Sequence, residues 1–331
     1  MNDLQGSNAS SVTVAGPAVK LSKFEVRFDA FSSVQSKSLY GNGRMQVRVM
    51  VFAEGEDADG NPVPLAYYPD LLTLKLIQYR DGRPLRDGWT VSSIENEYTH
   101  DMPGGSQAAL ASKVSTQSLA TRPVEFWVSS NRAESLDIAA EITVAGKVFR
   151  TNNTANPVGD RYDSAVTLIA VPPVTYAVEQ FSWGPQRVGG ELDGDVIYRY
   201  QLGLYLSAKQ VRLLSWTSTQ YAPHYPPVEF CSSGDLGSGK SIRHFMGVFP
   251  AVHVSRVDVN LPGGASHHYY LPVNQSRGEL TVVLGQSTKY YDNARVRREP
   301  YRFSVIDEYG NEHRLMIGIN LTNAYFTLLR G

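Results

Sequence analysis

One segment of the sequence has the spacing of a phosphate-binding loop. The residues from Gly234 to Ser241 follow the pattern G-x-x-x-x-G-K-S, in which backbone N–H groups and the lysine surround the phosphates of a nucleotide. Such a loop opens a well-formed helix within alternating strands and helices. Here Gly247 and Pro250 limit any following helix to about two turns. We therefore interpret the segment as a Gly/Ser-rich loop of a hairpin, and nucleotide binding as the alternative.

A second segment has part of the spacing of a calcium site. Asp57, Asp59 and Asn61 stand at the first three ligand positions of a helix-loop-helix calcium loop, but Pro62 occupies the position that requires glycine. The interpretation that we favour is a solvated hairpin turn, and a calcium ion bound at a strand loop is the alternative. The turn resembles turns of bacterial immunoglobulin-like modules, over too short a stretch to indicate a family.

The remaining reactive side chains form no catalytic pattern. None of the seven histidines belongs to an H-E-x-x-H motif, and the adjacent His267 and His268 would point to opposite faces of a strand. A G-x-S-x-G elbow is absent, and Cys231 is the single cysteine, so it can form neither an internal disulfide nor a thiolate metal site by itself. The sequence thus predicts no catalytic residue, metal ligand or cofactor, and we expect a protein that is not an enzyme.

The distinctive feature is an excess of tyrosine in turn-like stretches. The chain has 19 tyrosines and 12 phenylalanines, and three of the four tyrosine clusters lie in its second half. Tyrosine offers a large contact area together with a hydroxyl group, which suits protein interfaces and sugar-stacking sites. It is also a common strand residue at the edge of a core, which is the alternative. The candidate binding residues are Tyr221, His224, Tyr225, His268, Tyr269, Tyr270, Tyr290 and Tyr291.

The elements that position these residues are predicted to be β-strands. Apolar residues alternate with polar ones along the chain, for example from Val196 to Leu206 and from His313 to Ile319. Alternation is typical of antiparallel sheets with one buried and one solvated face. Helical spacing is confined to Gln107–Val114 and to Ala133–Ala140, and the latter reads better as part of a strand. The predicted fold is all-β, with two antiparallel β-sandwiches, immunoglobulin-like or jelly-roll-like, in tandem.

The predicted boundary between the sandwiches is the pair Pro172–Pro173, because proline cannot donate to a strand ladder and holds the chain extended. We expect a flexible N-terminal arm at residues 1–18, a first domain at 19–172 and a second domain with long Tyr/His-rich loops at 173–331. Whether the second half is one domain or two stays open.

Composition narrows the classes of function. The chain has 31 basic and 32 acidic residues and a net charge of -1, which excludes the basic footprint of a dedicated nucleic-acid binder. No apolar run is long enough to span a bilayer, and the N-terminus lacks the basic and apolar regions of a signal peptide. We expect synthesis in the cytoplasm, with association with a virion or release by a leaderless route.

Two classes of function are consistent with this composition. The first is a structural or accessory component of a larger particle, of phage-tail or injection-machine type, that uses the tyrosine loops as a protein-binding surface or forms a homo-oligomer. The second is a leaderless, toxin-like lectin that binds cell-surface glycans.

Overall fold

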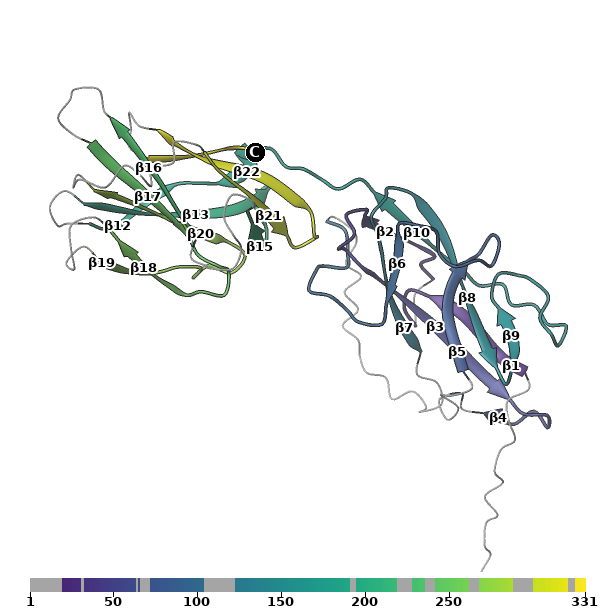
Figure 1. The fold of residues 1–331 in the computed structure, drawn as a ribbon. Helices are drawn as coiled ribbons and strands as arrows, with labels where there is room; N and C mark the ends of the chain where they lie inside the picture. Colours follow the sequence, from purple (N-terminus) through teal and green to yellow (C-terminus); the bar gives the residue numbers. More distant parts are fainter. Residues whose placement is uncertain are drawn as a thin grey trace, which may run out of the picture. The chain divides into compact units, whose positions relative to one another are not determined.

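β-Strands are the dominant secondary structure in the part of the chain that the computed structural model describes (Figure 1). The described residues are 20–30, 33–63, 65, 72–103, 123–190, 195–218, 228–235, 242–261, 268–287, 300–320 and 325–331. Within these ranges there is no α-helix, and Val178–Gln180 forms a short 3-10 turn. The prediction of an all-β protein is therefore confirmed. The segment Ala133–Ala140 enters strand β8 (Ser135–Val144), whereas Gln107–Val114 lies outside the described residues.

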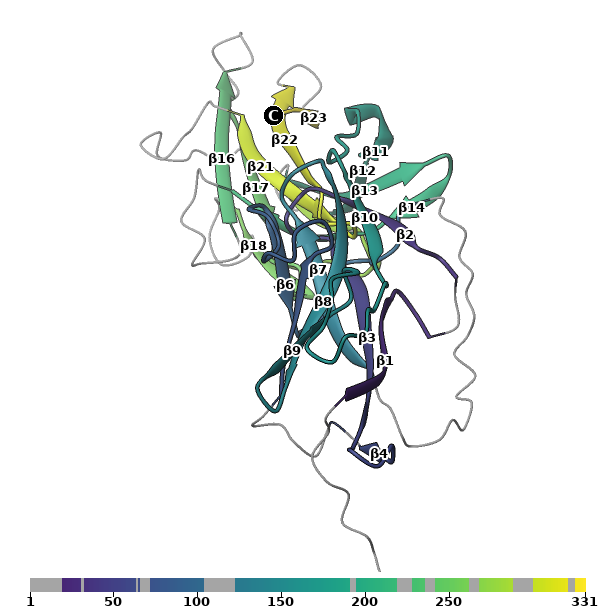
Figure 2. The same cartoon turned by 90° about the vertical axis from the view of Figure 1, so that its right-hand side faces the viewer.

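The chain divides into two compact units, residues 1–172 and 173–331, which we describe separately. The first unit has two sheets, each of five strands. One sheet has the order β1-β3-β7-β6 with β4 beside β3, and the other has the order β2-β10-β8-β5 with β9 beside β8 (Figures 1 and 2). The strands are β1 (Lys20–Arg27), β2 (Ser36–Tyr40), β3 (Val47–Glu56), β4 (Pro62–Val63), β5 (Leu72–Gln78), β6 (Trp89–Ser92), β7 (Val124–Ser130), β8, β9 (Lys147–Arg150) and β10 (Val166–Val171).

Strand β2 departs from the expected antiparallel arrangement, because it pairs with β10 in parallel. The chain leaves the first sheet after β1, forms β2 in the second sheet, and returns to the first sheet as β3. A strand that crosses between sheets in this way can join its neighbour in either direction. The five residues of β2 do not alternate between polar and apolar, so the sequence pattern did not indicate the direction of this strand.

The second unit has a seven-stranded sheet, a four-stranded sheet and a two-stranded sheet. The seven-stranded sheet has the order β11-β13-β20-β17-β16, with β12 and β14 beside β13, and the four-stranded sheet has the order β15-β21-β22-β23. The strands are β11 (Phe181–Ser182), β12 (Pro185–Gly189), β13 (Val196–Leu206), β14 (Lys209–Val211), β15 (Leu213–Thr217), β16 (Val228–Asp235), β17 (Ile242–Phe249), β20 (Leu280–Ser287), β21 (Tyr301–Asp307), β22 (Glu312–Asn320) and β23 (Tyr325–Arg330). The two-stranded sheet is the pair β18 (Arg256–Asn260) and β19 (His268–Pro272).

Strand β20 is buried on both of its faces, since all eight of its residues are buried. On one face Val283 packs in a cluster with Val257 and Val259 of β18. The approach is close, because a Cβ atom at Gly285 would lie 2.6 Å from Leu261 Cδ2. The pair β18–β19, which we call the hairpin, therefore covers the inner strands of the seven-stranded sheet. Its outer face then lies on the surface of this unit.

Both units contain a turn of the form D-x-x-G-N with the same hydrogen bonds. In the first unit Asp57 Oδ1 accepts from the N–H groups of Asp59 and Asn61, at 3.0 and 2.8 Å. In the second unit Asp307 Oδ1 accepts from Tyr309 and Asn311, both at 2.9 Å. The glycine of each turn has a positive φ, 83° at position 60 and 80° at position 310, a conformation that glycine adopts without strain. These turns fix the register of β3 with β4 and of β21 with β22.

Tyr200 in β13 is fully buried, and its hydroxyl oxygen accepts a hydrogen bond from the Phe326 N–H at 3.0 Å. Burial raises the pKa of Tyr200 to about 12, from the ordinary value of 10.0. Between pH 10 and pH 12 the unfolded chain loses this proton while the folded chain keeps it. We therefore expect the free energy of unfolding to fall over this range by about 2–3 kcal/mol on account of Tyr200.

The measurement is urea denaturation at pH 9, 10, 11 and 12, with Tyr200→Phe as the control. The variant is expected to start less stable, because the Phe326 N–H loses its acceptor, and to lose less stability as the pH rises. An equal loss in the two proteins would contradict the assignment.

Candidate functional site

The segment with the phosphate-loop spacing connects two antiparallel strands. Strands β16 and β17 pair from Val228↔Phe249 to Asp235↔Ile242, so residues 236–241 join the two strands of a hairpin. The chain that follows is strand β17, where a phosphate-binding loop would need the N-terminus of a helix. Lys240 and Ser241 themselves lie outside the described residues.

The carboxylate of Asp57, the first of the candidate calcium ligands, accepts hydrogen bonds from residues of its own turn. Besides the two backbone N–H groups, Asp57 accepts from the Asn61 side-chain amide, at 3.1 Å to Oδ2. In the described part of the chain, no three His, Cys, Asp or Glu side chains are grouped so that they could hold a metal ion.

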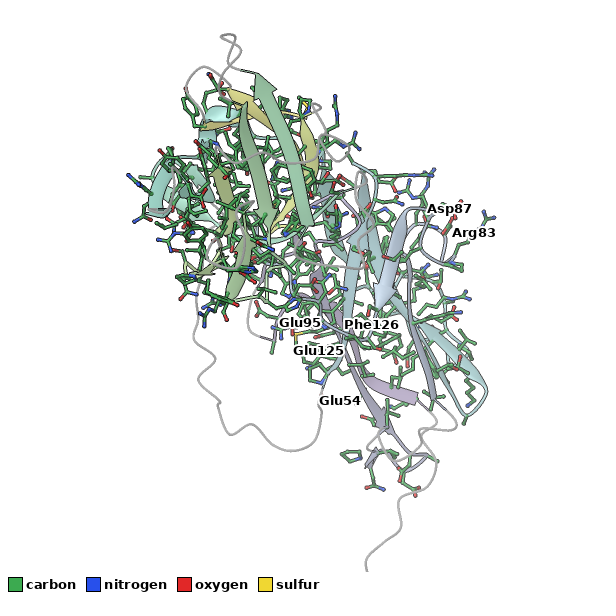
Figure 3. The ribbon with its side chains drawn as sticks, turned by 60° about the vertical axis from the view of Figure 1, so that its left-hand side comes forward. Glu54, Arg83, Asp87, Glu95, Glu125 and Phe126 are labelled. Carbon is green, nitrogen blue, oxygen red and sulfur yellow. The ribbon has the colours of Figure 1, made fainter. Side chains whose placement is uncertain are left out.

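Three glutamates of the first unit, Glu54, Glu95 and Glu125, lie beside basic side chains (Figure 3 labels them). Glu54 lies 3.8 Å from Lys23 Nζ, and Glu125 lies 3.3 Å from Arg48 Nη1. Glu95 Oε1 lies 2.8 Å from His100 Nε2, and the His100 ring packs 4.5 Å from that of Trp127. These contacts are typical of a satisfied surface and provide no catalytic arrangement.

The eight candidate binding residues are only partly described. Strand β19 begins with three of them, His268, Tyr269 and Tyr270. The other five lie outside the described residues, and their role in binding stays a prediction; they are Tyr221, His224, Tyr225, Tyr290 and Tyr291.

Tyr269 and Tyr270 face opposite sides of the hairpin, because successive side chains in a strand alternate between faces. Tyr269 is half-buried, packs against the apolar cluster under the hairpin and donates from its hydroxyl to Asp195 Oδ2 at 3.0 Å. Tyr270 is 60% exposed. Tyr269 therefore contributes to the packing beneath the hairpin, whereas most of the Tyr270 side chain is exposed.

Six side chains make up the outer face of the hairpin: Arg256, Asp258 and Asn260 from β18, and His268, Tyr270 and Pro272 from β19. The guanidinium carbon of Arg256 lies 4.9 Å from the centroid of the Tyr270 ring. Asp258 is directly opposite Tyr270 in the register, and its Oδ2 atom lies 3.2 Å from His268 Nδ1. These diagonal contacts restrain two side chains of β19. Tyr270 lies against the guanidinium group of Arg256, and His268 lies against the carboxylate of Asp258.

Besides Pro272, the residues of this face that were not among the sequence candidates are Arg256, Asp258 and Asn260 of β18. Their signal was the alternation of the segment R-V-D-V-N, in which every second residue is polar. That pattern places them on one face, but it does not indicate which strand lies beside them.

No protein-family model matches the sequence, and no curated protein is detectably similar to it. None of the described residues belongs to a helix with the length and apolar character needed to cross a membrane. The class that the structure defines is an all-β protein with several antiparallel sheets.

Proposed function

We propose that the protein is a non-catalytic recognition protein made of two β-sandwich domains of immunoglobulin type. In that fold the strands, lettered along the chain, lie in the orders A-B-E-D and C-F-G. In the first unit the order β1-β3-β7-β6 matches A-B-E-D and the order β5-β8-β10 matches C-F-G, which supports this assignment. The second unit supports it with β13-β20-β17, in the order B-E-D, and β15-β21-β22, in the order C-F-G. A jelly roll would have a different strand order, so the immunoglobulin type is the better match.

The outer face of the hairpin is the proposed recognition surface, and the observation that carries this proposal is the exposed Tyr270 ring beside Arg256. Tyrosine and arginine are the residue types that most often supply the binding energy of protein interfaces. Tyr270 is restrained before binding, since Arg256 lies against its ring, so little side-chain entropy is lost on contact.

A protein partner within a larger particle is the proposed context, of phage-tail or injection-machine type. The net charge of -1 supports a role in an assembly rather than binding to a polyanion. Glycan binding is the second candidate, favoured by the carboxylate of Asp258 and the amide of Asn260 on the same face as Tyr270. A tyrosine ring can pack on a sugar ring while such groups bind its hydroxyls.

The decisive comparison is between Tyr270→Ala and Tyr269→Ala. We expect Tyr270→Ala to weaken partner binding by about thirtyfold, or about 2 kcal/mol, and to leave the free energy of unfolding within about 0.5 kcal/mol. Tyr269→Ala is expected to lower the free energy of unfolding by about 1–3 kcal/mol, because it removes packing and the hydrogen bond to Asp195.

The partner is identified by photo-crosslinking from a benzoylphenylalanine at position 270 in the producing cells, with the same residue at the exposed Tyr205 as control. A protein crosslinked from position 270 but not from 205 would support the proposal, and its affinity is then measured with both alanine variants. Identical crosslinks from both positions would contradict a protein-binding surface here. Binding to a glycan array that Tyr270→Ala abolishes would select the second candidate.

A further inference from the structure

A polar groove of about 630 Å³ lies in the first unit, along the open edge of strand β1. It is lined on one side by β1 residues, including Lys23, Phe24 and Arg27, and on the other by residues 33–35 and 161–164. Strand β1 ends the order β1-β3-β7-β6, so its only strand neighbour in the described part of the chain is β3. An open strand edge presents backbone N–H and C=O groups that an extended peptide can pair with.

Side chains form hydrogen bonds with the backbone of β1 at two positions along this edge, Leu21 and Val26. Between these positions, the backbone groups of Phe24 face the same edge. The N–H of Val26 donates to Ser164 Oγ at 2.9 Å, and the C=O of Leu21 accepts from the Tyr162 hydroxyl at 2.6 Å. Alternate residues of an antiparallel strand direct their N–H and C=O groups to the same side, so the backbone of Phe24 points into the groove as that of Val26 does. Among the described residues, none bonds to the Phe24 backbone on this side.

The groove also contains an unneutralised positive charge. Arg27 pairs with Glu25 at 2.8 Å and Lys23 with Glu54 at 3.8 Å, while Asp163 accepts from the Tyr79 hydroxyl at 2.7 Å. Arg161 is exposed, and no carboxylate of the described part of the chain pairs with it. A guanidinium group binds a carboxylate with two parallel hydrogen bonds, which favours an acidic ligand here.

We infer that this groove receives a short extended peptide segment of a protein partner, with one residue paired to the Phe24 backbone and an acidic side chain bound to Arg161. The paired residue donates its N–H to the Phe24 C=O and accepts from the Phe24 N–H. This site is independent of the hairpin face in the second unit. The side-chain caps at Leu21 and Val26 limit the segment to a few residues, so binding is expected to be weak and reversible.

The test uses the full chain and a fluorescent seven-residue peptide that alternates threonine and valine around a central glutamate. We expect saturable binding with a dissociation constant below about 1 mM. Replacing the central glutamate with glutamine should weaken binding about five- to tenfold, and methylating the backbone nitrogens should weaken it about as much. Arg161→Ala should remove the preference for glutamate over glutamine, and Arg83→Ala, at an exposed arginine outside the groove, should keep it.

Three results would overturn the inference. They are no binding of the glutamate peptide at about 2 mM, twice the upper bound expected for the dissociation constant, equal binding of the N-methylated peptide, and a glutamate preference that survives Arg161→Ala. Each result would contradict one contact of the inferred site. None of them affects the proposed function, which the crosslinks from position 270 test separately.

Discussion

Replacing Asp307 with alanine is expected to lower the free energy of unfolding of the second unit by about 3–5 kcal/mol. The carboxylate is fully buried and accepts four hydrogen bonds: two from the backbone N–H groups of Tyr309 and Asn311, one from the Asn311 amide and one from His313 Nε2. Alanine supplies no acceptor, and His313 is also fully buried, between the rings of Tyr176 and Phe181. Water therefore cannot replace the lost partner.

Asp57→Ala is the matched control: Asp57 is buried as well, but the other residues of its turn, 58–61, are exposed. Water can reach the N–H groups that Asp57 leaves behind, so we expect a loss of only about 1–2 kcal/mol. Chemical denaturation measures both losses, and hydrogen exchange of the peptides that contain β21 and β22 locates the first. Equal losses at positions 57 and 307 would show that the turn alone, rather than its burial with His313, determines the effect.

Phe249→Ala is the second substitution with a large expected effect. Phe249 is fully buried at the end of β17, with Trp216 of β15 stacked at 4.1 Å and Phe303 of β21 edge-on at 5.1 Å. Its ring thus joins the seven-stranded sheet to the four-stranded sheet. Removing it creates a cavity between rigid rings, so we expect a loss of about 3–5 kcal/mol and a decrease in melting temperature on the order of 10 °C.

Calorimetry of the full chain measures this decrease, with Phe249→Leu as the conservative variant. Leucine refills much of the volume and is expected to recover more than half of the loss. Trp216 fluorescence is an independent readout, since the indole rests on the Phe249 ring. A loss below about 1 kcal/mol for Phe249→Ala would indicate that the two sheets are held together by other contacts.

Local chemistry was sufficient to predict much of this architecture. Alternation over Val196–Leu206 predicted strand β13, because a residue's polarity determines which face of a strand can be buried. The segment from Asp57 to Asn61 was predicted to be a hairpin turn, and Gly60 has the positive φ that closes it. For the candidate site, the sequence indicated His268, Tyr269 and Tyr270 as binding residues, but not that Tyr269 is half-buried while His268 and Tyr270 are exposed.

What the sequence determined by itself was the strand character of its segments and the chemistry of their turns, because both depend on neighbours a few residues away. Only the tertiary structure decided that β2 lies parallel to β10, that β20 is covered on both faces, and that Arg256 packs on Tyr270. These features depend on which strands become neighbours across long stretches of chain. That choice is made by the packing of whole sheets, and a period of two residues is the same whichever strand lies alongside.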